Sequence, residues 1–216
     1  MEDLMRSQQV ENILEVAGDL FLEFGFVNTR VSDIAARSEI STASIYKAFR
    51  SKDTLYCAVL AHGIEKLKIL ARPSALEGDP VSELWKACDH YQKLCVSPLF
   101  RDLIRAPVEH TSIPISFRRM MCRQLRSALE QMCMPALKAC ATGGVLDPRR
   151  VKEAFRLLSA YIEHQTIWYG LFISATARKS VEKVRIADEA VRIVLAAYPS
   201  KIGEAFDLSD VVVQSA

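Results

Sequence analysis

Several kinds of sequence signal are scarce in this chain of 216 residues, and their scarcity restricts what it does. Its six cysteines include no CxxC pair, and no HExxH, GxSxG, Walker or GxGxxG pattern is present. The start, MEDLMRSQQVENIL, lacks the basic residues and apolar run of a signal peptide, and charges interrupt every long apolar stretch. We therefore expect a cytoplasmic protein without a membrane segment, not an enzyme, with free cysteines serving as small apolar residues.

The charge of the whole chain is also uninformative, because a net charge of +2 identifies no partner. Its distribution is uneven, however. Basic side chains outnumber acidic ones between residues 30 and 52, whereas the stretch before it is acidic. The basic members are Arg30, Arg37, Lys47, Arg50 and Lys52. Any surface that binds an anion is therefore expected to be local.

Helical periodicity, by contrast, is present almost everywhere, and strand signals are nearly absent, so we predict an all-α fold. An apolar stripe marks a first helix that stops at Gly25. Its members are Ile13, Ala17, Leu20, Phe21 and Phe24. Capping residues predict three further starts, at Thr29, at Ser41 and at Ser51. The second helix buries Val31, Ile34 and Ala35, the third ends at Phe49, and the fourth runs towards Leu70.

The rest of the chain reads as longer helices after a break at RPSALEGDP, residues 72–80. We expect them at about 80–96, 98–106, 114–141, 148–174 and 180–197. The tail, residues 199–216, begins with a proline and is expected to be poorly ordered.

The stretch EISTASIYKAF, residues 39–49, has little to contribute to a core on its first turn. It belongs to the second of two short helices joined by about three residues, an arrangement typical of the helix-turn-helix. Small side chains at Thr42, Ala43 and Ser44 would let this helix sit deep in the major groove and bond bases or phosphates. Tyr46 and Lys47 can reach phosphates, while Ile45 and Phe49 face inward. Lys52 lies at a helix N-terminus, which favours anions.

The same region carries a set of spaced residues: Phe24-Gly25-Phe26, Thr29, Ile34-Ala35, Ser41, Ile45-Tyr46, Phe49 and Lys52 before Leu55. With them, the segment ILEVAGDLFLEFGFVNTRVSDIAARSEISTASIYKAFRSKDTLYCAVL resembles the DNA-binding domain of TetR-family transcriptional regulators. Glu39 and Ala43 replace glycines usual in that family, and Ala48 replaces a histidine that contacts phosphate. The motif and the resemblance together predict nine DNA-binding residues: Thr29, Arg30, Ser41, Thr42, Ala43, Ser44, Tyr46, Lys47 and Lys52.

A helix-turn-helix protein that reads a palindrome is expected to be a homodimer. Two apolar stripes are candidates for the interface, although intramolecular core accounts for part of each. One runs through Val184, Ala187, Val191, Val194 and Tyr198, and the other through Phe155, Leu158, Ile162, Gln165, Trp168, Tyr169 and Phe172. The resemblance implies that these last two long helices pair with their copies, so that charges at Val191 and Val194 would produce monomers.

The resemblance also implies a pocket for a small-molecule effector, whose identity the sequence leaves open. Nine residues are candidates, each with ordinary core as the alternative: Trp85, His90, Tyr91, Phe100, Met120, Met121, Tyr161, His164 and Trp168. Beyond Cys88-x-His90 no metal-ligand spacing is present, so no metal or cofactor is expected. Arg119, Arg123 and Arg126 read as a solvated face rather than an anion site, and the cysteine pairs seven residues apart require tertiary partners for thiol sensing.

These observations predict three segments: a helix-turn-helix DNA-binding domain at 1–55, a helical ligand-binding and dimerisation domain at 56–198, and the tail. The expected function is that of a dimeric transcriptional repressor, released from a palindromic operator on double-stranded DNA by a small apolar or amphipathic effector. The alternatives are a DNA-binding protein that needs no effector and a small all-helical enzyme.

Overall fold

The computed structural model describes the backbone of residues 2–172 and 186–200, and the side chains of residues 7–167 and 186–200. The α-helices of these ranges are α1 (Glu2–Asn28), α2 (Val31–Ser38), α3 (Thr42–Phe49), α4 (Lys52–Leu70), α5 (Pro80–Cys95), α6 (Pro98–Glu109), α7 (Ile115–Thr142), α8 (Val151–Phe172) and α10 (Ile186–Ala197). A 3-10 helix, Pro148–Arg150, precedes α8, and an isolated β-bridge joins Leu146 to Pro199. The predicted all-α fold is confirmed. Val184 and nearly all of the predicted tail lie outside the described residues.

The chain folds into two compact units that interleave along the sequence. The first contains Met1–Leu67 and Asp102–Gln124, and the second contains Lys68–Arg101 and Leu125–Ala216. Helices α4, α6 and α7 each contribute residues to both. Helix α6 also continues through Pro107 to Glu109, beyond the end predicted at residue 106, because a proline in the last turn removes a single backbone donor.

In the first unit, α1 is interrupted at Gly25, which has a φ of 78° and a ψ of 163°. A left-handed φ is easily adopted only by glycine, so the predicted helix stop is confirmed at this residue. This break also changes the last position of the predicted apolar stripe. Phe24 is 51% exposed and does not join the core, because the altered path of the chain turns Phe26 inward in its place.

Thr29 corrects a second expectation, because it does not cap α2. The N-cap is Arg30, which makes no side-chain capping bond. The Thr29 hydroxyl lies instead 3.0 Å from the Leu20 carbonyl oxygen and 2.8 Å from that of Gly25. Thr29 is 2% exposed, so it fastens the end of α1 from inside the unit.

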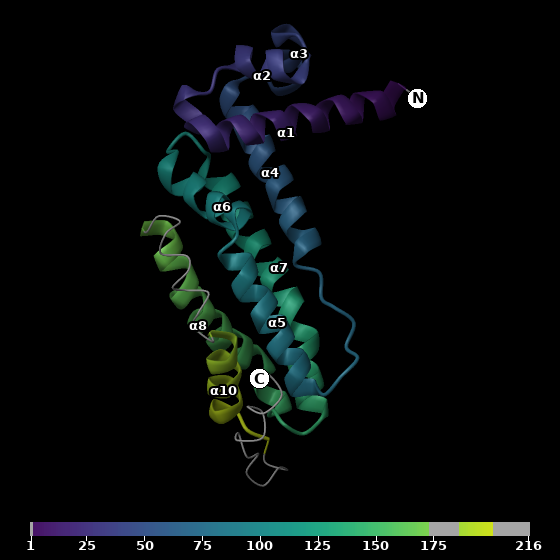
Figure 1. Cartoon of the computed structure of the whole chain (residues 1–216), viewed down its shortest axis with the longest axis vertical. Coiled ribbons are helices and arrows are strands. Elements are labelled where there is room, and N and C mark those ends of the chain that lie inside the picture. The colour runs from purple at the N-terminus through teal and green to yellow at the C-terminus, as the bar shows by residue number, and fades with distance from the viewer. Residues whose placement is uncertain (1, 173–185, 201–216) are drawn as a thin grey trace. The chain divides into compact units, whose positions relative to one another are not determined.

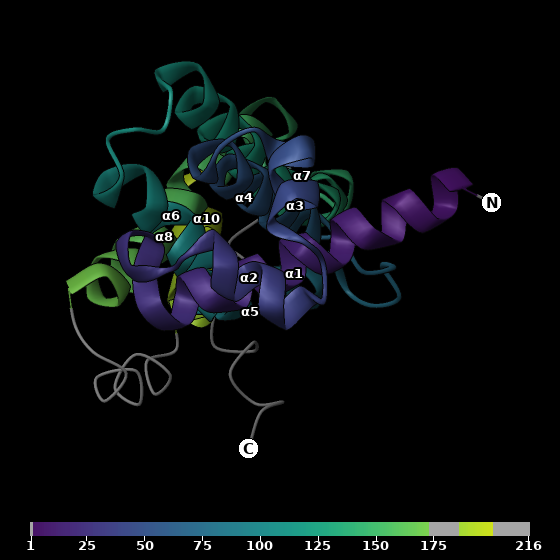
Figure 2. The same cartoon turned by 90° about the horizontal axis from the view of Figure 1, so that it is seen from above.

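The turn between α2 and α3 has the predicted length and capping chemistry. Helix α2 packs against α1, and α3 packs against α2 (Figure 2). Ser41 Oγ accepts a hydrogen bond from the Ser44 amide at 3.1 Å, which confirms Ser41 as the N-cap of α3. Ser51 Oγ likewise accepts from the Thr54 amide at 3.1 Å, and Thr54 Oγ1 accepts from the Ser51 amide at 3.0 Å. These reciprocal bonds begin α4 at Lys52 as expected.

Glu39 occupies the left-handed position of this turn, with a φ of 58°, where glycine would be unstrained. We expect Glu39→Gly to raise the free energy of unfolding by about 0.5–1 kcal/mol. The gain is smaller than the strain itself because glycine also increases the entropy of the unfolded chain. Urea unfolding measures the change. Glu39→Ala removes the same carboxylate without relieving the strain, so an equal gain in that variant would contradict the explanation.

In the second unit, α10 packs against both α5 and α8 (Figure 1). Its inward face is the apolar stripe predicted for dimerisation, including Val191 and Val194, which are buried inside a single chain. The assignment of these two residues to an interface between subunits is therefore wrong, and charges there would not test dimerisation. An unpaired charge there would disrupt the unit itself before it could separate two subunits.

Candidate DNA-binding site

Helix α3 divides into one buried side chain and an exposed face. Ile45 is 1% exposed and Phe49 is half-buried, so both face inward as predicted. Tyr46 is 48% exposed, and the remaining predicted contacts of the helix are exposed as well. They are Thr42, Ala43, Ser44 and Lys47. The outer surface of α3 therefore begins with small polar groups and continues with longer side chains.

The hydroxyls on this face differ in how many hydrogen bonds they already make within the chain. Ser41 and Ser44 bond to one another, with their Oγ atoms 2.8 Å apart, in addition to the capping bond. Ser41 therefore acts first as a cap that defines the start of α3. Ser44 retains free lone pairs on its oxygen and can accept a further hydrogen bond.

Lys52 is half-buried, and its ammonium has a defined position. Its Nζ donates to the Val27 carbonyl oxygen at 3.2 Å and lies 4.6 Å from the centroid of the Phe26 ring. A carbonyl and an aromatic face both attract an ammonium group. An ammonium has three donors, so the pairing with Val27 leaves others able to meet a phosphate. The free amides of the first turn of α4 add to the same anion-attracting end.

The Phe26 ring belongs to an aromatic cluster within the first unit, formed by Phe21, Phe26, Tyr56 and His110. The centroid of Phe26 lies 4.8 Å from that of Tyr56 and 5.0 Å from that of His110. Burial raises the pKa of Tyr56 to about 12, with smaller contributions from the carboxylates of Glu109 and Asp102. Sequence reasoning missed His110, because the residues that share this cluster are far apart along the chain.

Only some of the basic side chains between residues 30 and 52 are free to bind an anion. Arg37 Nη1 lies 3.7 Å from a carboxylate oxygen of Glu23 on α1, so one cation already has a partner. Arg30 is exposed at the N-cap of α2. Arg50, which was not among the predicted contacts, follows α3 with a φ of 59° and is also exposed. Thr29 is the exception among the predicted contacts, since its side chain points into the unit.

The residues predicted to line an effector pocket differ in their burial. Tyr91, Phe100 and Met121 are buried, whereas Trp85 and His164 are exposed. His90, Met120 and Tyr161 are half-buried, and the side chain of Trp168 lies outside the described residues. Met120 and Met121 belong to the first unit and the others to the second.

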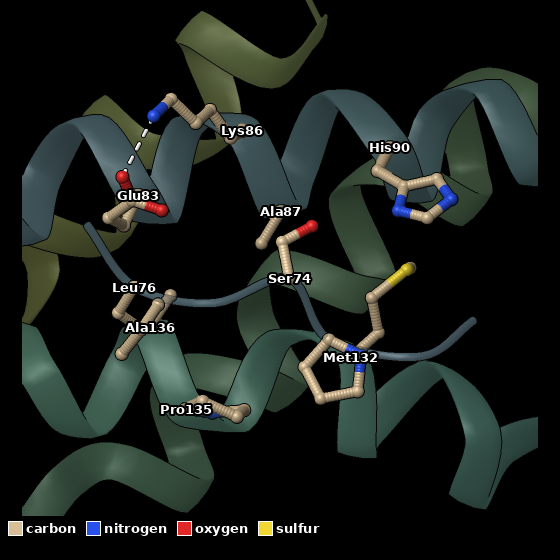
Figure 3. A pocket seen from close by; sticks show the side chains of 10 residues that line it. Ser74, Leu76, Glu83, Lys86, Ala87, His90, Met132, Pro135 and Ala136 are labelled. Atoms are coloured by element: carbon tan, nitrogen blue, oxygen red, sulfur yellow. Dashed lines mark hydrogen bonds and ion pairs between the residues drawn. The ribbon is translucent and has the colours of Figure 1, made fainter. Parts of the chain in front are cut away.

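His90 lines a small cavity of the second unit, between α5 and α7 and beneath the linker that precedes α5 (Figure 3). Met132 and Pro135 line it from α7, and the Lys86–Glu83 ion pair, at 2.8 Å, closes one side. Its free volume of about 20 Å³ admits a water molecule but no larger ligand. An effector would therefore need a rearrangement at this place.

The core of the second unit also contains a polar pair that sequence reasoning missed. The Tyr91 hydroxyl donates to the Glu163 carboxylate at 2.6 Å, from α5 to α8. Burial raises the pKa of Tyr91, and Cys95 and Glu163 raise it further. Tyr91 was predicted as an aromatic wall, yet its hydroxyl has this fixed partner.

Four of the six cysteines are buried, as expected of small apolar residues, whereas Cys57 is half-buried and Cys122 is exposed. Burial governs the four buried thiols. It raises the pKa of Cys133 and of Cys140 to about 12, and it raises the pKa of Cys88 and Cys95 as well. Such thiols carry little thiolate at neutral pH and react slowly. Within the described residues, no three His, Cys, Asp or Glu side chains are grouped as a metal site. Nor is any helix in these ranges long and apolar enough to cross a membrane.

Two family models match the chain. The model of bacterial regulatory proteins of the tetR family matches residues 13–59, and that of the AefR-like transcriptional repressor C-terminal domain matches residues 82–200. The HTH-type transcriptional repressor Rv3405c of Mycobacterium tuberculosis is 34% identical over 94 residues, which are 44% of this chain and 48% of that protein. The HTH-type transcriptional regulator HbdR of Aromatoleum sp. is 27% identical over 138 residues, 63% of this chain and 59% of its own. The matches thus span about half the length of these relatives.

Solved structures share the fold. A TetR-family regulator from Mesorhizobium loti has a TM-score of 0.71 at 17% identity, covering 89% of this chain and 98% of its own. A TetR regulator from Agrobacterium tumefaciens has a TM-score of 0.71 at 19% identity, covering 90% and 96%. AibR, in complex with isovaleryl coenzyme A and operator DNA, has a TM-score of 0.54 at 19% identity, covering 86% and 97%. This chain belongs to the TetR family of DNA-binding transcriptional regulators, which are not enzymes, and carries an AefR-like C-terminal domain.

Proposed function

We propose that this protein is a dimeric cytoplasmic repressor that reads a palindromic operator through α3 and leaves it when a small apolar or amphipathic effector binds. The observation that carries the DNA-binding part is the division of α3. Its N-terminal side chains are small, polar and exposed, while Ile45 holds the helix from beneath. A helix built in this way can enter the major groove closely.

The proposed contacts fall into two groups. Thr42, Ala43 and Ser44 approach base edges, because the first residues of a recognition helix lie deepest in the groove. Arg30, Ser41, Tyr46 and Lys52 hold the phosphate backbone on either side of it. Lys47 can reach a phosphate or a guanine. Thr29 acts inside the unit, so we leave its side chain out of the interface.

Lys52→Ala tests the backbone group. We expect it to weaken binding to all DNA sequences alike and to lower the slope of log affinity against log salt by about one unit per subunit. Thr42→Ala should instead cost about 1–3 kcal/mol at the preferred site and relax the preference at one position of each half-site. The measurement is a set of titrations at several salt concentrations, on a palindrome selected from random DNA and on a scrambled duplex.

Lys66→Ala is the matched control for this experiment. It removes the same charge from the same helix, but fourteen residues further along α4, about 21 Å away. That distance exceeds the screening length at physiological salt, so the slope should not change. An unchanged slope in Lys52→Ala, together with intact specificity in Thr42→Ala, would show that α3 is not the reader.

Dimerisation is supported by the outer face of α10. Val191 and Val194 are buried in the core of the second unit, whereas Ile193 on the outer face is 37% exposed. Ala196 and Ala197 are exposed beside it, together with the charged residues Glu189 and Arg192, so small apolar and charged side chains share this face. Two copies of such a face can pack closely, and a two-fold axis would place two recognition helices on one palindrome.

The effector is proposed to be apolar or amphipathic because the second unit offers no metal cluster among its described residues and no reactive thiol. An effector that rearranged the second unit would meet the Tyr91–Glu163 pair as a polar group within an apolar surrounding, which suits an amphipathic molecule. AibR binds an acyl thioester, so fatty acids and their coenzyme A thioesters are suitable first probes. Titrating them into the operator complex should release DNA. Release by peroxide that Cys→Ser changes abolish, or a zinc ion retained against a chelator, would contradict this part.

A further inference from the structure

The ring of Phe26 has a cation on one side and a histidine on another. Lys52 Nζ lies 4.6 Å from its centroid, and the His110 ring lies 5.0 Å away at an interplanar angle of 57°. Val27, the next residue, supplies the carbonyl that accepts from Lys52. Both anchors of the ammonium therefore belong to one dipeptide, which follows the break in α1 at Gly25.

His110 is held in place by Arg118. The guanidinium of Arg118 donates through Nη2 to the His110 carbonyl at 3.2 Å and to that of Thr111 at 2.9 Å. Its Nε donates to the Ile113 carbonyl at 2.9 Å. Three carbonyls of the loop between α6 and α7 thus share one rigid fork, and the loop presents the His110 ring to Phe26 and Tyr56.

We infer that His110, fixed by Arg118, is a positioning residue for the Lys52 ammonium and acts through the ring of Phe26. The inference rests on the proposed contact between Lys52 and a DNA phosphate. Of the four residues His110, Arg118, Phe26 and Lys52, only Lys52 needs to touch DNA.

The physical reason is the flexibility of a lysine side chain, which loses much rotamer entropy when it is fixed. The Phe26 ring and the Val27 carbonyl hold the ammonium in place before DNA arrives, so less entropy is lost on binding. Without the His110 ring, Phe26 has space on that side and its dipeptide is held less firmly. Lys52 then enters the complex from a broader set of positions.

The test is a double-mutant cycle on the full-length protein, with the selected palindrome and a scrambled duplex as probes. His110→Ala should lower the affinity for both duplexes by about three- to tenfold. In the Lys52→Ala background the same change should alter the affinity less than about twofold, because the residue through which His110 acts is gone. His110→Phe restores a ring and should restore the affinity.

Arg118→Lys is a second variant for the case in which His110→Ala does not fold. Lysine retains the positive charge but lacks the guanidinium that bonds the three loop carbonyls. Arg118→Lys should therefore weaken DNA binding, as His110→Ala does, and only when Lys52 is present. Equal losses with and without Lys52 would show a merely structural role, and no loss in either background would also overturn the inference. Neither of these two results would contradict the contact between Lys52 and a phosphate. An unchanged salt slope in the single variant Lys52→Ala would overturn both that contact and the inference.

Discussion

Replacing Ile193 by aspartate is expected to convert the dimer into monomers and to lower the affinity for the palindrome by at least about 100-fold. Replacing its neighbour Val194 in the same way should instead unfold the second unit. Ile193 is 37% exposed on the outer face of α10, so the carboxylate of an aspartate there can reach water in the monomer, whereas an interface over this face would bury it. Val194 is 0% exposed, so the carboxylate of an aspartate at this position would lie unpaired in the core, at a cost of several kcal/mol.

These two variants are matched, since they introduce the same charge at adjacent positions of one helix. Sedimentation measures the association state, and circular dichroism during thermal unfolding measures the fold. Ile193→Asp should retain the helical circular dichroism of a folded chain while it loses the dimer. If it remains dimeric, the interface lies on another surface of the chain.

The second large effect concerns Ile45, beneath the reading face of α3. We expect Ile45→Ala to lower the free energy of unfolding by about 2–4 kcal/mol, because it removes a fully buried side chain and leaves a cavity. Weaker DNA binding would follow from the disordered helix and would affect every sequence. Thr42→Ala, three residues earlier on the exposed face, should leave the stability within about 0.5 kcal/mol and change only the sequence preference.

Urea unfolding and DNA titration on the same preparations separate the two effects. Ile45→Val is the conservative control and should cost about 0.5–1.5 kcal/mol, with binding nearly intact. A stable Ile45→Ala protein that has nevertheless lost operator binding would contradict the assignment of Ile45 to the core.

Local sequence chemistry determined much of this protein. The bounds of α3, the caps at Ser41 and Ser51 and the break at Gly25 agree with the predictions. Helical periodicity, capping hydroxyls and glycine each act on residues within one or two turns, so a linear reading contains the needed information. The division of α3 into a buried Ile45 and an exposed polar face follows from the same periodicity. The domain boundary predicted at residue 55 stays a prediction.

Tertiary structure decided the remainder. A stripe shows that one face of a helix is buried, but not against which partner. For that reason Val191 and Val194 were predicted for an interface between subunits and were found against α5 and α8. Thr29 had a capping sequence context, yet the carbonyls of Leu20 and Gly25 bind its hydroxyl. The association of Lys52, Phe26, His110 and Arg118 could be seen only in the folded chain, because ring faces and guanidinium forks join residues that no helical period relates.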